Sequence, residues 1–355
     1  MKRRRLSAAG VVAGATAMAA MTAVPFAQQA AAPTQAAPQG QTWTVPRTAW
    51  GAPDLQGVWT NNNATPLERP KELADRQFLT DQEVESLKRS AAQLFDGNGD
   101  AAFGDSVFVA ALRNAQGFTS TDTSTGNYNQ FWLVDRDFDN RTSLITDPPD
   151  GRIPALTAEN QRKQAATAER RKLRPADGPE SFSLSLRCIT FGLPNTFAGY
   201  NSYYQFVQSP EYVVIFTELI HDARIIPLDG RPHLPQGVRQ WLGNSRGRWE
   251  GDTLVVETTN FVDQSMNGMS ALRVSGDENM RLVERFTRVG PETIHYEFTI
   301  DDPTMWTRPW TAMIPLKHST DQIYEFACHE GNHSMTGSLS GARYEEREAR
   351  EKGSK

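Results

Sequence analysis

The chain has 355 residues, of which 38% are hydrophobic, so it is long enough for one large β-rich domain or two smaller ones. Either size leaves ample apolar surface for a buried core. The formal net charge at pH 7 is −5, and removal of the four cationic residues 2–5 takes it to −9. An acidic chain is repelled by a phosphate backbone, which excludes nucleic acid as an expected partner.

Residues 1–32 have the composition of a secretory leader. Residues 2–5 are basic (KRRR), residues 6–24 are apolar and rich in Ala, Gly and Met, and small residues follow. This order predicts a signal peptide over 1–32 and export to the periplasm or beyond, by the general secretory or the twin-arginine route. A transmembrane anchor is the alternative, although the apolar run is barely long enough. We expect no membrane span after removal of the leader.

The composition then divides the rest of the chain. Residues 33–49 begin with Ala, Pro, Gln and Gly and are predicted to form a flexible linker. A single β-rich domain is expected over 50–345, with a loop- and helix-rich part at 50–190 and a β-meander barrel at 200–335. Residues 346–355 are predicted to be a disordered tail.

The first half of this domain contains signals for one short strand and two helices. Residues 53–59 (PDLQGVW) predict a turn followed by a strand. Thr80 and Glu83 fit a capping box, and apolar residues then recur at helical spacing as far as a stop at residues 96–97. A second helix is expected over 157–173, where the polar faces indicate a surface position.

The second half alternates apolar and polar residues between turn signals. The candidate strands cover residues 203–207, 212–220, 224–227, 253–259, 281–288, 293–300, 310–316 and 322–328. Eight strands are enough to close a small barrel around one ligand. The sequence therefore predicts a mainly β fold, an antiparallel up-and-down, lipocalin-like β-barrel with a loop-rich N-terminal region and one or two helices.

Cys188 and Cys328 are the two cysteines of the chain. Because an exported protein meets an oxidising compartment, we predict a disulfide between them. A cysteine nucleophile and a metal-bound thiolate are the alternatives.

Two motifs match known catalytic signatures in an unfavourable context. Residues 329–333 read H-E-x-x-H, in which His329 and His333 would bind zinc and Glu330 would polarise a water, but the motif follows an apparent strand and contains a glycine. Residues 243–247 match the G-x-S-x-G nucleophile elbow, yet no helix follows, so a hairpin turn explains the two glycines.

The segment 218–224 carries the stronger acid–base candidates, because a histidine beside carboxylates is suited to proton transfer near neutral pH. His221 would move the proton, Asp222 would orient it and Arg224 would stabilise developing negative charge. Glu218, His329 and Glu330 complete the predicted catalytic set. The alternative for the segment is a buried Glu–Arg or Asp–Arg pair that ties strands together.

Four strings resemble a family of exported bacterial proteins of unassigned function. They are PDLQGVW at 53–59, IPLDGRPHLP at 226–235, RWEGDTLVV at 248–256 and CHEGN at 328–332. This resemblance implies secretion and no particular chemistry. Gly57 and Trp59, followed by a meander of strands, also resemble lipocalins and other calycin-type barrels, which implies a ligand cavity.

These features together lead to one functional expectation and two alternatives. We expect an exported barrel that binds a small apolar, aromatic or terpenoid molecule and acts on it by cofactor-independent acid–base chemistry of the lyase, isomerase or hydratase type. A non-catalytic periplasmic ligand-binding protein is the first alternative. A zinc-dependent hydrolase that uses His329, Glu330 and His333 is the second.

Overall fold

A computed structural model describes residues 43–95, 100–102, 105–114, 129–173, 176–262 and 278–353. The predicted leader and most of the predicted linker lie outside the described residues. The helices are α1 (Asp81–Leu94), α2 (Ser106–Leu112), α3 (Ala158–Leu173) and α4 (Ser334–Gly353). The strands are β1 (Gly57–Thr60), β2 (Ile145–Asp147), β3 (Tyr203–Gln208), β4 (Tyr212–Thr217), β5 (Ala223–Pro227), β6 (Asn244–Glu250), β7 (Thr253–Thr259), β8 (Arg281–Gly290), β9 (Thr293–Asp301) and β10 (Trp310–Ser319).

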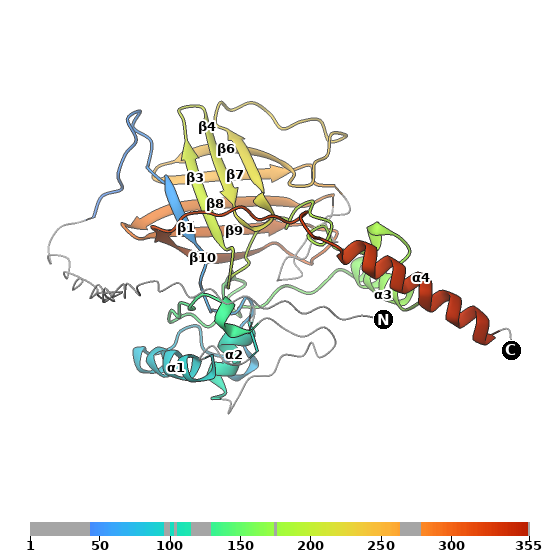
Figure 1. Cartoon of the computed structure of the whole chain (residues 1–355). Coiled ribbons are helices and arrows are strands. Elements are labelled where there is room, and N and C mark those ends of the chain that lie inside the picture. The colour runs from blue at the N-terminus through green and yellow to red at the C-terminus, as the bar shows by residue number, and fades with distance from the viewer. Residues whose placement is uncertain are drawn as a thin grey trace, which may run out of the picture. The chain divides into compact units, whose positions relative to one another are not determined.

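The strands form one antiparallel sheet, which confirms the mainly β prediction (Figure 1). Its order is β5-β4-β3-β1-β10-β9-β8-β7-β6, and β2 pairs with β10 outside this path. From β3 to β5 and from β6 to β10, neighbours in the chain are neighbours in the sheet. The first strand, β1, lies between β3 and the last strand, β10. The strands from β3 to β10 form an up-and-down meander, and β1 joins its first strand, β3, to its last strand, β10. Its described ladder is nevertheless open between β5 and β6, so the predicted closed barrel is not formed by backbone hydrogen bonds.

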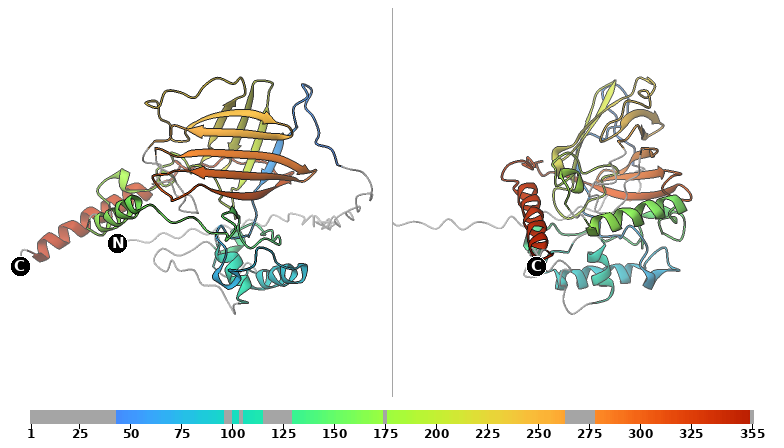
Figure 2. Two further views of the ribbon diagram at one scale, coloured as in Figure 1. Left: turned by 180° about the vertical axis from the view of Figure 1, so that it is seen from behind. Right: turned by 90° about the vertical axis from the view of Figure 1, so that its right-hand side faces the viewer.

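The sheet coils back on itself, so that strands distant in its order face each other. In Figure 1 the yellow-green strands β3 and β4 stand across the orange strands β8 and β9, and Figure 2 shows the same crossing from behind. Phe206 of β3 meets Phe286 of β8 edge to face with ring centroids 5.3 Å apart. Large side chains fill the space enclosed by the sheet, including Trp59, Phe206, Phe286, Tyr296, Phe298 and Trp310.

Alternation along β9 shows how the sequence creates this interior. Ile294, Tyr296, Phe298 and Ile300 are all buried, whereas the residues between them are only partly covered. Successive side chains of a strand point to opposite faces, so one face of β9 lines the core and the other faces outward.

Trp59 anchors the strand that joins the two ends of the meander. Its side chain is fully buried, and its indole Nε1 donates to the carbonyl oxygen of Leu55 at 2.9 Å. The Arg288 guanidinium lies over its ring at 5.2 Å and donates to the carbonyl oxygen of Asp54 at 3.0 Å. The tryptophan that carries the calycin resemblance is thus fixed by both polar and stacking contacts.

The predicted N-terminal signals for helix α1 are confirmed in atomic detail. The Thr80 hydroxyl accepts from the Glu83 amide, and the Glu83 carboxylate accepts from the Thr80 amide at 2.8 Å. This reciprocal capping satisfies amides that have no partner inside the helix. The predicted surface helix at 157–173 is also present, as α3. None of the described helices combines the length and apolar composition that a membrane crossing requires.

The strand predicted at 322–328 is absent, because β1 and β9 already occupy both edges of β10. This segment instead belongs to an irregular stretch, residues 320–333, which we call the strap. Residues 243–247, predicted as a hairpin turn, lie largely within strand β6. The tail predicted from residue 346 is helical as far as Gly353, where charged pairs such as Lys352 with Glu348 support α4.

Gly247 allows β5 and β6 to approach each other without a shared ladder. A β-carbon built on Gly247 would lie 2.7 Å from Leu228 Cδ2 and 2.9 Å from Ile226 Cγ2. We predict that Gly247→Val lowers the free energy of unfolding by about 1–3 kcal/mol through overpacking. Urea denaturation followed by circular dichroism measures the effect.

Gly290→Val is the matched control, since a β-carbon at Gly290 meets no atom within 4 Å and its φ is not left-handed. Equal destabilisation by both variants would show that general strand effects, not contact between β5 and β6, are responsible.

Candidate functional site

Three of the predicted catalytic residues, Glu218, His221 and Asp222, lie in the tight turn between β4 and β5, and Arg224 follows in β5. β4 ends at Thr217, a single turn of 3-10 helix spans Leu219–His221, and β5 begins at Ala223. Ile220 and His221 have φ of 58° and 49°, in the left-handed region. Such a conformation is rare for a β-branched residue and costs on the order of 1–3 kcal/mol.

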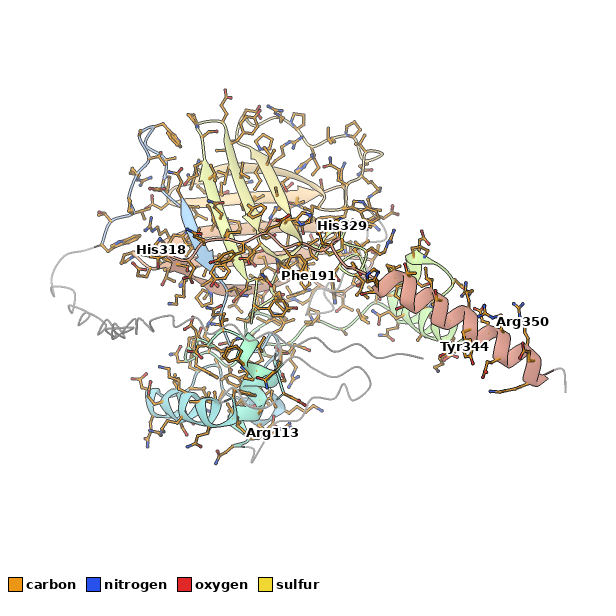
Figure 3. The ribbon with its side chains drawn as sticks, in the orientation of Figure 1. Arg113, Phe191, His318, His329, Tyr344 and Arg350 are labelled. Carbon is orange, nitrogen blue, oxygen red and sulfur yellow. A yellow bond between two sulfur atoms is a disulfide. The ribbon has the colours of Figure 1, made fainter. Side chains whose placement is uncertain are left out.

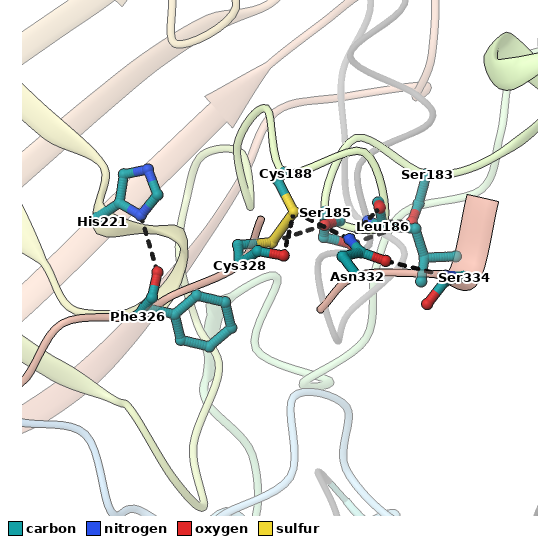
Figure 4. The surroundings of a disulfide bond; sticks show 9 residues. All are labelled: Ser183, Ser185, Leu186, Cys188, His221, Phe326, Cys328, Asn332 and Ser334. Atoms are coloured by element: carbon teal, nitrogen blue, oxygen red, sulfur yellow. Dashed lines mark hydrogen bonds between the residues drawn. A yellow bond between two sulfur atoms is a disulfide. The ribbon is translucent and has the colours of Figure 1, made fainter. Parts of the chain in front are cut away.

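The strap holds this strained turn from outside. Ile220 is buried in a cluster to which Phe326 of the strap contributes, and His221 Nδ1 lies 3.1 Å from the Phe326 carbonyl oxygen (Figure 4). The strap begins near Tyr203, whose hydroxyl donates to Asp321 at 3.0 Å. Cys328 of the strap is joined to Cys188 by a disulfide, which confirms the predicted pairing.

The strap and the turn form an open groove of about 560 Å³, called here the strap groove. The structure brings His221, His329 and Glu330 together along it, with Phe216 and Tyr324 as apolar neighbours. All three predicted catalytic side chains are exposed. Figure 3 labels His329 near the end of the strap and His318 at the end of β10.

The H-E-x-x-H residues do not have the geometry of a zinc helix. Residues 329–332 form a turn, and α4 begins only at Ser334, whose amide donates to Asn332 Oδ1 at 3.1 Å. His329 and His333 therefore do not lie one helical turn apart on one face. Within the described ranges, no group of three or more His, Cys, Asp or Glu side chains is arranged to hold a metal ion.

Glu218 is an anchor inside the protein. It is 3% exposed, and Asn201 Nδ2 donates to its Oε1 at 2.6 Å. Burial raises the pKa of Glu218 above its usual value. Glu218 does not line the strap groove, although its backbone carbonyl oxygen accepts from the His221 amide at 3.0 Å.

Arg224 forms a buried ion pair with Glu284, on β8. Nη1 donates to Oε1 at 3.0 Å and Nη2 lies 2.5 Å from Oε2, while the two side chains are 6% and 1% exposed. Nη2 also contacts the hydroxyls of Ser245 on β6 and Thr258 on β7 at 3.1 and 3.3 Å. Burial alone would lower the pKa of Arg224, but the Glu284 carboxylate outweighs it and raises that pKa.

The polar cluster extends further into the interior. The Tyr296 hydroxyl donates to Glu284 Oε1 at 2.8 Å, and burial together with this carboxylate raises the pKa of Tyr296. A cavity of about 10 Å³ beside the cluster has room for about one water molecule. The interior is thus a packed core at this point, and a larger molecule would have to bind elsewhere.

A second open groove, of about 450 Å³, lies along β5 and β6 where the ladder is interrupted. We call it the seam groove. Asp222 and Arg224 line it from the β5 side, and Trp241, Ser245 and Arg246 line it from the other side. The predicted catalytic set is therefore divided between two grooves, except for Glu218, which lines neither.

The Asp222 carboxyl lines this groove, and hydrogen bonds fix only one of its two oxygens. Its Oδ2 accepts from the Thr190 hydroxyl at 2.7 Å and from the Phe191 amide at 3.1 Å. Among the described residues no hydrogen-bond donor contacts Oδ1. Burial raises the pKa of Asp222, despite the opposing effect of its two hydrogen bonds.

Sequence reasoning missed Glu284, Thr190 and Arg246 as site residues. Glu284 offered a signal, because it stands between Leu282 and Phe286 at an inward-facing position of β8. A charged residue on the buried face of a strand is expected to have a charged partner. Thr190 and Arg246 are close to the site only because of the tertiary fold.

Comparison of the chain with protein-family models, curated proteins and solved structures gave no match. The resemblance to exported bacterial proteins and to calycins therefore stays a prediction.

We predict that Glu284→Gln lowers the free energy of unfolding by about 3–5 kcal/mol, because it leaves the buried Arg224 charge without its counter-ion. Denaturant unfolding measures the loss. In the double variant Arg224→Met/Glu284→Met no buried charge remains, so it should be more stable than Glu284→Gln. A double variant less stable than Glu284→Gln would contradict the assignment of the cost to the uncompensated charge.

We predict that Cys188→Ser/Cys328→Ser lowers the free energy of unfolding by about 2–5 kcal/mol, since the disulfide joins residues 140 positions apart. Thermal unfolding with and without reductant measures this effect. Reductant should destabilise the wild type alone. The prediction fails if reductant shifts the melting temperature of both proteins equally.

Proposed function

We propose that this chain is an exported small-molecule-binding protein that performs acid–base chemistry in the seam groove, with Asp222 as the group that transfers the proton. The observation that carries the proposal is the set of hydrogen bonds and the burial of the Asp222 carboxyl. One oxygen accepts hydrogen bonds from Thr190 and Phe191, the other has no hydrogen-bond partner among the described residues, and burial raises the pKa of the carboxyl above its usual value. A positioned carboxyl with a raised pKa is suited to both donating and accepting a proton.

The walls of the seam groove favour an apolar or aromatic substrate. Trp241 and Leu242 line the groove together with Ile225, which is 67% exposed on β5. An indole ring and aliphatic side chains around a few polar groups are typical of small-molecule sites. Lyase, isomerase or hydratase chemistry suits such a site, because each class needs a proton moved at one substrate atom.

The disulfide supports the proposed export. Disulfides persist in oxidising compartments such as the periplasm, and reducing conditions in the cytosol disfavour them. The leader-like composition of residues 1–32 points the same way.

A non-catalytic binding protein is the second candidate, and one observation favours it. Arg224, which would have stabilised negative charge on a substrate, is already neutralised by Glu284. In that case the seam groove would hold its ligand without changing it.

Proton transfer at carbon separates the two candidates. The purified protein is incubated in D2O with a panel of aromatic and terpenoid carbonyl compounds, and loss of C–H signals is followed by ¹H NMR. We expect exchange above background for at least one compound and a loss of about 10²-fold or more in Asp222→Asn. Glu218→Gln is the matched control, since it removes another buried carboxylate outside the groove. Equal exchange in wild type and Asp222→Asn would reject the catalytic proposal.

Asp222→Asn should also change how stability depends on pH. The folded pKa of Asp222 is raised, so ionisation of this carboxyl destabilises the folded state as pH rises above the unfolded value of about 3.9. The asparagine keeps an oxygen acceptor for Thr190 and Phe191 and cannot ionise. We predict that the stability of the variant relative to wild type increases between pH 3 and pH 7, as measured by urea unfolding at each pH. A difference independent of pH would contradict this prediction.

A further inference from the structure

Arg246 carries a positive charge at the seam groove and forms no ion pair with any described carboxylate. It lies on β6 and is half-buried. Its Nε donates to the carbonyl oxygen of Pro232 at 3.0 Å, and its Nη1 donates to that of Ser245 at 2.7 Å. These neutral acceptors fix the guanidinium in place, and Nη2 has no hydrogen-bond partner in the described part of the chain.

Two carboxylates lie near Arg246, and neither forms an ion pair with it among the described residues. Glu257, which stands opposite Arg246 in the β6–β7 ladder, is paired with Arg281 and His233. Asp229 is paired with Arg231 and receives several of its guanidinium hydrogen bonds. Burial and the neighbouring Arg231 charge lower the pKa of Arg246 and outweigh the Asp229 carboxylate, which acts in the opposite direction. An anion placed beside Nη2 would relieve this unfavourable environment.

Among the described residues that line the groove, Arg246 is the cation without an ion-pair partner. The charge of Arg224 is cancelled by Glu284, as described above. Burial raises the pKa of Asp222, whose carboxyl accepts hydrogen bonds from Thr190 and Phe191. A ligand in the seam groove therefore meets one uncompensated positive charge, with Trp241 in the same wall.

We infer that the seam groove binds an aromatic carboxylate, with the carboxylate on Arg246 and the ring beside Trp241. This inference rests on the proposed function for the groove and adds the chemical class of its ligand. Guanidinium groups form paired hydrogen bonds with carboxylates and are less strongly hydrated than ammonium groups. Because Arg246 already has two of its nitrogens anchored, little conformational entropy is lost when an anion binds.

The test compares aryl carboxylates of one to three fused rings, such as 2-naphthoate, with the matching primary amides. Isothermal titration calorimetry on the full mature chain gives both dissociation constants. We expect the best carboxylate to bind about ten- to a hundredfold more tightly than its amide, and the preference to fall as salt rises. Equal affinity for both probes, or no saturable binding of either, would overturn the inference.

Arg246→Gln should abolish the preference for the carboxylate and leave the affinity for the amide within about twofold, which shows that the groove is intact. Arg248→Gln is the matched control. Arg248 lies on the same strand, carries the same charge, is paired with Glu250 and does not line the groove. A preference that survives in Arg246→Gln, or is lost equally in Arg248→Gln, would contradict the assignment.

The outcome is separable from that of the proposed function. Anion preference without Asp222-dependent exchange would keep the ligand class and reject catalysis. Asp222-dependent exchange without anion preference would keep the catalytic proposal and reject the aromatic carboxylate as the ligand class.

Discussion

The guanidinium of Arg224 holds together four strands where the antiparallel ladder is interrupted. Arg224 belongs to β5, and it reaches Ser245 on β6, Thr258 on β7 and Glu284 on β8. β1 joins the other ends of the meander by backbone hydrogen bonds, so the described sheet has its open edges at β5 and β6. Side-chain contacts from one buried cation thus replace a row of backbone bonds.

This arrangement explains why the seam can host a groove. Two strands joined by a ladder lie about 5 Å apart, which leaves no space between them. Strands joined through side chains can separate locally, and here they do so beside Asp222 and Arg246. Gly247 brings the same strands close together further along β6, so the opening is confined to one part of the seam.

Much of the fold could be predicted because local patterns specify it. The Thr80 capping box, the alternation along β9 and seven of the eight predicted strands appear in the structure. The eighth predicted strand, residues 322–328, is absent for a reason that cannot be seen in a local sequence pattern. Whether residues 322–328 can join a sheet depends on a free edge beside β10, and β1 had taken that edge.

The site was less predictable for the same physical reason. Asp222 and Arg224 are two positions apart, which suggested a shared role, and both do reach the seam groove. The role of Arg224 depends on Glu284, a residue 60 positions away that only the coiling of the sheet brings within hydrogen-bond distance. His221 is adjacent to Asp222, yet it lines the strap groove, because the backbone reverses between them.

The backbone reversal at Ile220 and His221 is conformationally strained, and contacts around the turn offset this strain. Two consecutive left-handed residues without glycine disfavour the turn by on the order of 2–6 kcal/mol. Burial of the Ile220 side chain returns on the order of 1.5–3 kcal/mol. The Thr217 amide also donates to the Asp222 carbonyl oxygen at 2.8 Å, which closes the turn. The strap covers Ile220 and is itself fixed by the disulfide at Cys328. Because Asp222 follows this turn directly, the disulfide also helps to fix the position of the Asp222 carboxyl.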